Sequence, residues 1–301
     1  MPSEGTHPIY RIAIDYTAAA RETAGIGRYA RELVHAIMTG DPAHSYVLMT
    51  GMAGLGAAWD TEKTVLQHLL PQNRLQFRDL PLTDDWIARL WQRLRLPIPA
   101  DWITGRADLF YSPNFVLPPL LPRTPSLLTV HDLSFMRYPE TFPDKLHTYL
   151  TNVVPRSVDN ATHIITDSEA TRQDLIDLCG TDPEKITTLL LGVAPRFTSQ
   201  PGPDERQQLR DRYAIGDRPY ILAVGTVQPR KNYIRLMQAL DPITGKLNID
   251  LVIVGRPAWL SEPILQQAAR RPYVHMLGFL DDNDLPAVYR QAELLTFPSL
   301  Y

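Results

Sequence analysis

Two adjacent cations, Arg230 and Lys231, stand between a strand-like run, Tyr220–Val224, and an amphipathic helical pattern, in the stretch "VGTVQPRKN". Arginine offers a planar fork that matches two oxygens, and lysine offers a compact point charge, so the pair suits a diphosphate. Gly225 permits a tight exit from the strand, and Pro229 stiffens the approach to the pair. A helix beginning directly afterwards adds its positive end. The stretch therefore predicts a diphosphate site, with a solvated basic turn as the alternative.

Three further loops carry unusual residues after strand-like runs. In "LLTVHDLSF", His131 and Asp132 follow an apolar strand, and a neutral histidine there can hydrogen-bond a substrate or cap the strand through the backbone. In "DYTAAARETAGIGRYARELV", Gly25 and Gly27 allow close approach of a ligand at a helix start, or simply form a flexible turn. In "LVIVGRPAW", Arg256 follows a strand and a glycine, and suits either a phosphate or ribose or a structural salt bridge.

The elements that must position these loops form two α/β series. Strands that alternate with helices predict parallel sheets, and ligands of such sheets bind beyond the carboxyl ends of the strands. The predicted strands are Arg11–Ile14, Tyr46–Met49, Leu75–Phe77, Leu109–Tyr111, Leu127–Val130, His163–Thr166, Thr187–Leu190, Tyr220–Val224, Ile249–Val254, Val274–Leu277 and Leu294–Phe297.

Helical spacing covers Gly27–Met38, a stretch between an N-cap at Ser168 and a stop at Gly180, Ile234–Leu240, and stretches near Pro263–Ala269 and Leu285–Ala292. We predict an N-terminal Rossmann-like domain over 1–192, a linker and the start of the next domain over 193–218, and a partial Rossmann-like domain over 219–301. The two domains are expected to face a cleft. The stretch "RLWQRLRLPIPA" fits an amphipathic core helix, or a surface for an acceptor or a membrane.

Composition narrows the classes of function. The net charge of −3 argues against a nucleic-acid-binding protein. The single cysteine, Cys179, fits a reducing cytosol, and neither a membrane span nor a signal peptide is evident. The eight histidines are scattered without a metal-binding pattern, and a P-loop is absent. An NAD dehydrogenase is disfavoured because no GxGxxG is followed by an acidic residue about 20 positions later.

Several stretches, in their order along the chain, resemble the retaining glycosyltransferases of the large family 4 (group 1) type, which have the GT-B fold. The most specific are "TVHDLSF" and "GTVQPRKN"; "GIGRYARELVHAI", "SEATRQDL", "LVIVG" and "AELLTFPSLY" accompany them. The similarity is closest to bacterial mannosyltransferase-like members that build polysaccharides and glycolipids. It implies an α/β fold of two Rossmann-like domains.

The resemblance also implies roles for individual residues. His131 would lie against the transferred sugar, while Arg230 and Lys231 would bind the diphosphate and neutralise it as it leaves. The implied donor-binding residues are Gly25, Gly225, Thr226, Arg256, Gly278, Phe279 and Leu280, and the implied acceptor-side residues are Gly27, Arg28 and Asp132. Many relatives have an arginine where this chain has Thr226, so one phosphate contact is expected to be absent or supplied otherwise.

The end of the chain departs from the family pattern. Relatives continue after "FPSLY" with a Glu-x7-Glu motif whose carboxylates meet the donor sugar and the ribose. The last predicted strand also lacks a covering helix, which is unfavourable for a parallel sheet. We therefore expect the second domain to be incomplete and the chain to be C-terminally truncated.

The resulting hypothesis is the transfer of a hexose, with mannose favoured, from a nucleotide diphosphate sugar to a saccharide or lipid-linked acceptor, with retained configuration. GDP-mannose is the first candidate donor and UDP-glucose the second, and neither a cofactor nor a metal is expected. The alternatives are a non-catalytic nucleotide-sugar-binding protein or fragment, and a GT-B sugar-nucleotide epimerase. The expected location is the cytoplasm, at or near the inner face of the membrane. The sequence specifies no oligomeric state.

Overall fold

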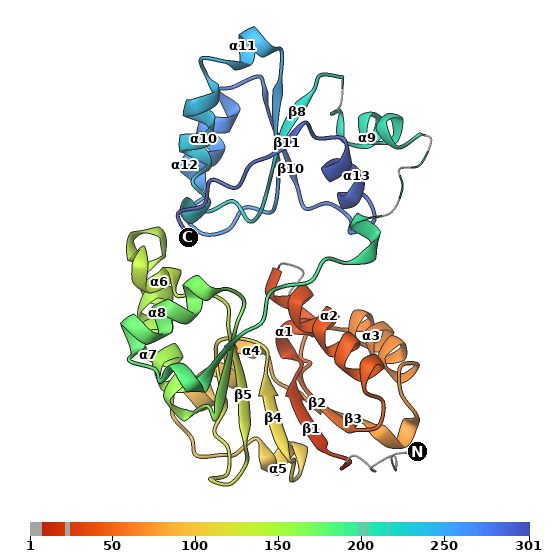
Figure 1. The fold of residues 1–301 in the computed structure, drawn as a ribbon, viewed down its shortest axis with the longest axis vertical. Coiled ribbons are helices and arrows are strands. Elements are labelled where there is room, and N and C mark those ends of the chain that lie inside the picture. The colour runs from red at the N-terminus through yellow and green to blue at the C-terminus, as the bar shows by residue number, and fades with distance from the viewer. Residues whose placement is uncertain (1–7, 22–24, 199, 201, 203, 216) are drawn as a thin grey trace, which may run out of the picture. The chain divides into compact units, whose positions relative to one another are not determined.

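The computed structural model describes residues 8–21, 25–198, 200, 202, 204–215 and 217–301 (Figure 1). The chain divides into two compact units. The first comprises Met1–Leu133 and Leu150–Leu190, and the second comprises Ser134–Tyr149 and Leu191–Tyr301. The predicted domain 1–192 includes Ser134–Tyr149, whereas the structure groups that segment with the second unit. Each unit contains its own parallel sheet.

The first unit is built on a seven-stranded sheet in the order β3-β2-β1-β4-β5-β6-β7. Its pairings are parallel, and Ile14 of β1 lies opposite Leu48 of β2 and Tyr111 of β4. The strands are β1 Arg11–Asp15, β2 Ser45–Gly51, β3 Leu75–Leu80, β4 Leu109–Ser112, β5 Ser126–Val130, β6 His163–Thr166 and β7 Ile186–Thr188. Parallel strands align their carboxyl ends at one edge, which is where the predicted loops lie.

The core of the first unit explains why these segments form strands and helices. Strand β2 is buried along nearly its whole length, as expected for a parallel strand covered on both faces. Helix α2 buries Ala30, Val34 and Met38 at helical spacing against Ile14 and Leu48. The helices up to residue 179 are α1 Thr17–Arg21, α2 Gly25–Gly40, α3 Ala57–Gln67, α4 Asp84–Ala88, α5 Asp101–Thr104, α6 Ser134–Arg137, α7 Asp144–Asn160 and α8 Glu169–Cys179. Of these, α6 and the start of α7 belong to the second unit.

The second unit contains a four-stranded parallel sheet in the order β10-β9-β8-β11. Its strands are β8 Tyr220–Val224, β9 Asp250–Val254, β10 Val274–Gly278 and β11 Leu294–Leu295. Its helices are α9 Glu205–Tyr213, α10 Tyr233–Leu240, α11 Thr244–Leu247, α12 Glu262–Ala269 and α13 Leu285–Arg290. Alternate residues of β8 face opposite sides: Ile221 packs with α10 and α12, and Leu222 packs with α9 and α13 (Figure 1). A pair of helices therefore packs on each face of β8, whereas Leu294 and Leu295 of the edge strand β11 are 55% and 49% exposed, as expected for a last strand without a covering helix.

Each predicted strand overlaps an observed one, and His163–Thr166 and Tyr220–Val224 have the predicted bounds. The caps of α8 are confirmed, since Ser168 accepts a hydrogen bond from the Thr171 amide and Gly180 is left-handed. The strand prediction Thr187–Leu190 was shifted, because the observed β7 begins at Ile186 and ends at Thr188.

The predicted helix over "RLWQRLRLPIPA" was mostly wrong. The structure has one π-helical turn, Arg89–Arg93, directly after α4, and no helix over residues 94–100. Pro97 and Pro99 lack the amide protons that a continuing helix needs, so the pattern of apolar residues does not extend the helix. Trp91 is nevertheless buried, as a core residue would be.

Candidate active site

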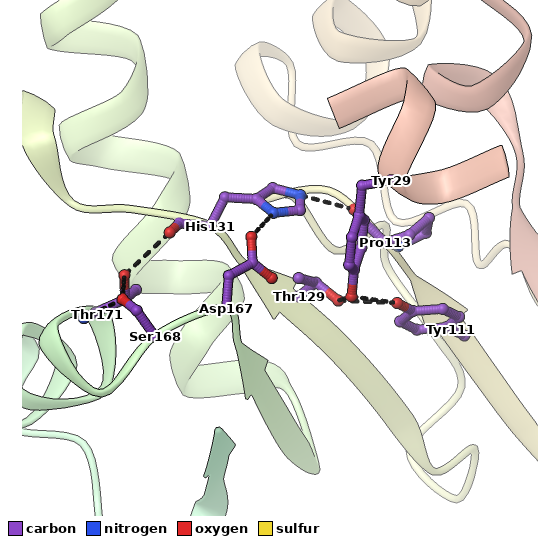
Figure 2. Close-up of polar contacts among 8 residues, drawn as sticks. All are labelled: Tyr29, Tyr111, Pro113, Thr129, His131, Asp167, Ser168 and Thr171. Atoms are coloured by element: carbon purple, nitrogen blue, oxygen red, sulfur yellow. Dashed lines mark hydrogen bonds and ion pairs between the residues drawn. The ribbon is translucent and has the colours of Figure 1, made fainter. Parts of the chain in front are cut away.

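The ring of His131 is held by two acceptors at the carboxyl edge of the first sheet. His131 follows β5 and Asp167 follows β6, and these strands pair in parallel, so their ends lie side by side. The Nδ1 atom lies 2.6 Å from Asp167 Oδ2, and the Nε2 atom lies 3.0 Å from the Pro113 carbonyl oxygen (Figure 2). Only 9% of the His131 side chain is exposed. Both ring nitrogens are therefore engaged by atoms of the protein.

Two aromatic rings enclose the imidazole. Tyr29 of α2 meets it edge to face at a centroid distance of 4.8 Å, and Phe115 does so at 5.3 Å. The Tyr29 hydroxyl belongs to a triangle with the Tyr111 hydroxyl at 3.3 Å and Thr129 Oγ1 at 3.2 Å (Figure 2). Burial raises the pKa of both tyrosines, so the triangle is a set of neutral hydroxyls at physiological pH. These contacts fix the plane of the His131 ring.

Helix α8 fixes the backbone of His131. Thr171 Oγ1 donates to the His131 carbonyl oxygen at 3.0 Å, and the Thr171 amide donates to Ser168 Oγ at 3.1 Å (Figure 2). The same first turn thus caps α8 and holds the residue that follows β5. We call His131, Asp167, Tyr29, Phe115 and Thr171 the His131 group.

The predicted donor-binding residue Gly25 and the predicted acceptor-side residues Gly27, Arg28 and Asp132 lie in the segments of the chain that contain Tyr29 and His131. Gly25 begins α2, and no atom of the described residues lies within 4 Å of the place where its Cβ would be. Gly27 is buried, and Arg28 directly precedes Tyr29, which touches the His131 ring. Asp132 is half-buried beside His131. Residues 22–24 of the same predicted loop lie outside the described residues.

The Arg230–Lys231 pair lies where it was predicted, at the carboxyl end of β8. A 3-10 turn, Pro229–Lys231, is followed by Asn232 in the left-handed conformation, and α10 begins at the next residue. Asparagine tolerates this conformation better than most residues. The stem of Lys231 packs on Gly225, whose added Cβ would lie 3.2 Å from Lys231 Cε. The glycine therefore leaves room for the lysine as well as for the turn.

The last residues of the chain contact this turn. Arg230 Nη1 donates to the Tyr301 carbonyl oxygen at 3.2 Å, and the Leu300 amide donates to the Arg230 carbonyl oxygen at 2.9 Å. The ammonium of Lys231 lies 4.7 Å from the centroid of the Phe297 ring, a cation–π contact. The stretches "VGTVQPRKN" and "FPSLY" are therefore neighbours in space.

The other predicted donor-binding residues follow β8, β9 and β10. Thr226 is half-buried in the loop after Gly225. The Arg256 guanidinium lies 4.3 Å from the centroid of the Phe279 ring, which is 45% exposed. Gly278 is left-handed and Leu280 is buried. Arg256 thus makes a cation–π contact, and within the described part of the chain it does not form the salt bridge that the sequence also allowed.

Asp167, Tyr29 and Phe115 were missed by reasoning from sequence. The rule that selected the four predicted loops would also have selected Asp167, because it directly follows the strand His163–Thr166. Tyr29 gave no such signal, since its spacing only marked it as a core-facing residue of α2.

Two further features concern metals and membranes. Across the described residues, histidine, cysteine, aspartate and glutamate side chains form no group of three or more that could hold a metal ion. Among the same residues, no helix is both long enough and apolar enough to cross a membrane.

Comparison with known proteins identifies the family. The family model described as Glycosyltransferase Family 4 matches residues 23–197, and that described as Glycosyl transferases group 1 matches residues 205–301. The chain belongs to glycosyltransferase family 4. This family 4 chain is 27% identical over 284 residues to O-antigen chain mannosyltransferase B of Escherichia coli, covering 92% of this chain and 73% of that protein. It is also 33% identical to D-inositol 3-phosphate glycosyltransferase of Salinispora arenicola, over 47% of this chain and 35% of that one.

Solved structures resemble the fold of this family 4 glycosyltransferase. Anabaena Alr3699/HepE, solved in complex with UDP and glucose, matches 96% of this chain and 73% of its own with a TM-score of 0.63 and 17% identity. WaaG, a glycosyltransferase of lipopolysaccharide biosynthesis, matches 96% of this chain and 75% of its own, also with a TM-score of 0.63 and 17% identity. The predicted GT-B fold and the predicted glycosyltransferase class are confirmed.

Proposed function

We propose that this glycosyltransferase moves a hexose from a nucleotide diphosphate sugar to a saccharide or glycolipid acceptor, with retention of the anomeric configuration. The observation that carries the proposal is the position of Arg230 and Lys231, two cations in one turn at the carboxyl end of a buried parallel strand. A helix start directly behind them adds positive potential. This combination suits a leaving diphosphate.

The chemistry follows from the charges. Breaking the glycosidic bond leaves an oxocarbenium-like sugar and a diphosphate whose negative charge grows along the reaction path. Fixed cations stabilise that charge without reorganisation, which is electrostatic catalysis rather than covalent catalysis. Arg230 and Lys231 would supply this stabilisation without a metal ion. His131 would donate a hydrogen bond to the transferred sugar.

We propose mannose, carried by GDP, as the first candidate for the transferred sugar. The support is the similarity to O-antigen chain mannosyltransferase B. UDP-glucose is the second candidate, supported by the fold similarity to HepE solved with UDP and glucose. Titration calorimetry with GDP-mannose and UDP-glucose against the protein separates the two.

The substitution Lys231→Ala tests the proposed role of the cation pair. Loss of one such charge raises the barrier by on the order of 3 kcal/mol, so donor turnover should fall about a hundredfold. Lys246→Ala is the matched control, because Lys246 lies exposed in α11 of the same unit. Equal turnover by the two variants would refute the assignment.

We also propose a peripheral contact with an anionic membrane, at the segment 86–98. It contains Arg89, Arg93 and Arg95 and no acidic residue, while Trp86 and Leu94 are exposed by 51% and 65%. Basic and aromatic side chains together favour the interface of anionic bilayers. Sedimentation with phosphatidylglycerol vesicles should decrease in a Trp86→Ala, Leu94→Ala double variant, and unchanged sedimentation would reject the contact.

A further inference from the structure

The Asp167 carboxylate is buried, and among the described residues its hydrogen-bonding partner is His131. Its Oδ2 atom meets His131 Nδ1 at 2.6 Å, and its Oδ1 atom is buried without a hydrogen bond from any described residue. The side chain is only 15% exposed. A carboxylate in such a place requires a paired positive charge, because an uncompensated buried charge is costly.

The second ring nitrogen of His131, Nε2, also faces a hydrogen-bond acceptor. The Pro113 carbonyl oxygen, 3.0 Å from Nε2, can only accept a hydrogen bond. An ionised carboxylate at Nδ1 also only accepts. A ring with protons on both nitrogens satisfies both contacts at once, whereas either neutral tautomer leaves one nitrogen lone pair facing an acceptor oxygen.

We propose that Asp167 is a positioning residue of the transferase that holds His131 doubly protonated and oriented, so that Nε2–H can exchange the Pro113 oxygen for an oxygen of the bound donor. This inference rests on the function proposed above. A charge-assisted hydrogen bond is roughly twice as strong as a neutral one, so the pair would strengthen the hold of His131 on the donor.

The surroundings of the ring favour exchange at Nε2 over rotation of the ring. Tyr29 and Phe115 pack on the imidazole. Thr171 holds the His131 carbonyl oxygen (Figure 2). Asp167 directly precedes Ser168, the N-cap of α8, so the positive end of that helix also stabilises the carboxylate. Of the two described atoms that accept a hydrogen bond from the ring, the Pro113 oxygen is the uncharged one, so a substrate oxygen replaces it more readily than it replaces the Asp167 carboxylate.

The variant Asp167→Asn removes the negative charge of the side chain while keeping nearly the same size and shape. An asparagine amide can donate to Nδ1 while Nε2–H still donates to Pro113, so the ring keeps its place but becomes neutral. We expect kcat/KM for the donor to fall about tenfold, the difference between a charge-assisted and a neutral hydrogen bond. Asp167→Ala removes the hydrogen-bonding partner of Nδ1, so we expect kcat/KM for the donor to fall further than in Asp167→Asn.

Nuclear magnetic resonance of the protein labelled with ¹⁵N-histidine reads the ring directly. Wild type should show both ring N–H signals of His131, identified by their loss in His131→Gln, and Asp167→Asn should retain only the Nε2–H signal. Glu62→Gln is the matched control, because Glu62 lies 3.3 Å from His35 Nε2 in the same unit but outside the His131 group. It should alter the signals of His35 alone and leave turnover unchanged.

The outcomes separate this inference from the proposed function. A single ring proton on His131 in wild type, or an unchanged spectrum in Asp167→Asn, would overturn the inference whatever the enzyme transfers. The expected spectra together with unchanged donor kinetics in Asp167→Asn would reject the positioning role. Failure of the proposed function itself would be seen in the Lys231→Ala and Lys246→Ala comparison, which does not involve His131.

Discussion

Gly255 marks the closest approach between two loops at the edge of the second sheet. Its backbone has a φ of +155°, and an added Cβ would lie 2.0 Å from the Gly225 carbonyl oxygen. Beyond the strands, the Val227 amide donates to the Arg256 carbonyl oxygen at 2.9 Å, so the loops stay paired. The loop that leads into the Arg230–Lys231 turn is thus held by main-chain contacts with the loop after β9.

The substitution Gly255→Ala should therefore push the loop after β9 away from the Gly225 carbonyl group. Because the neighbouring atom is main chain and cannot rotate away, we expect a loss of at least about 2 kcal/mol in the free energy of unfolding. Gly245→Ala is the control, because Gly245 lies in helix α11 and no atom of the described residues lies within 4 Å of its added Cβ. Urea unfolding of both variants measures the difference, and equal stability would contradict the close approach.

At the scale of residues, the sequence predicted the location of side chains that is determined by their position within one strand–loop–helix unit. Gly225, Arg230 and Lys231 follow a buried strand, so their place at the sheet edge could be inferred. The pairing of His131 with Asp167 could not, because it requires the order of β5 and β6 in the sheet. The contact of Phe297 with Lys231 likewise depends on β11 lying beside β8.

At the scale of elements, α9 and α13 are joined by an ion pair. Arg290 donates to both carboxylate oxygens of Glu205, whose side chain is 11% exposed. The hydrogen bonds from Arg290 lower the pKa of Glu205, an effect that burial only partly opposes. Both helices cover the same face of the second sheet, so the pair stabilises that layer.

Glu205→Gln should consequently show a stability loss that depends on pH. The folded-state pKa lies below the unfolded value, so the pair stabilises the fold above about pH 4.5 and ceases to do so as pH falls through the folded-state pKa. We expect a loss of about 2 kcal/mol at pH 7 that shrinks below pH 4.5. Urea unfolding between pH 7 and 3.5, with exposed Glu184→Gln as control, measures it; a constant loss would contradict the mechanism.

Elements were predicted best where the apolar pattern was long and well bounded. Helix α8 had both a serine cap and a glycine stop, and its bounds followed from local chemistry. The π-helical turn Arg89–Arg93 had no such local signal, since the arginines and leucines there read equally well as a regular helix. Strand β11 is shorter than predicted: Leu294 and Leu295 lie opposite Ile221 and Leu222 of β8, and the sequence does not reveal how far this pairing extends.

At the scale of the whole molecule, the division into units does not follow chain order. Trp259 Nε1 donates to the Thr141 carbonyl oxygen at 3.0 Å, and its ring lies 5.6 Å from that of Phe142. Phe142 in turn packs on Phe135. These contacts connect the segment Ser134–Tyr149 to the loop after β9 within the second unit.

Trp259→Ala should loosen that segment. Losing one hydrogen bond and one aromatic pair costs about 1.4 kcal/mol or more, so amide hydrogen exchange across 134–149 should accelerate about tenfold. Trp102→Ala is the control, because that side chain is 70% exposed in the other unit. Exchange that stays unchanged across 134–149 in Trp259→Ala would show that the segment is held by other contacts.

The parallel pairing of the strands also determines the order of events during biosynthesis. Parallel neighbours cannot be joined by a tight hairpin. Strand β1 can therefore pair with β4, whose Tyr111 lies opposite Ile14, only after the ribosome has synthesised β4. At ordinary translation speeds the delay is roughly 5 to 20 s, during which apolar strands lack their partners. Early nascent chains of this enzyme are therefore expected to require shielding by ribosome-associated chaperones.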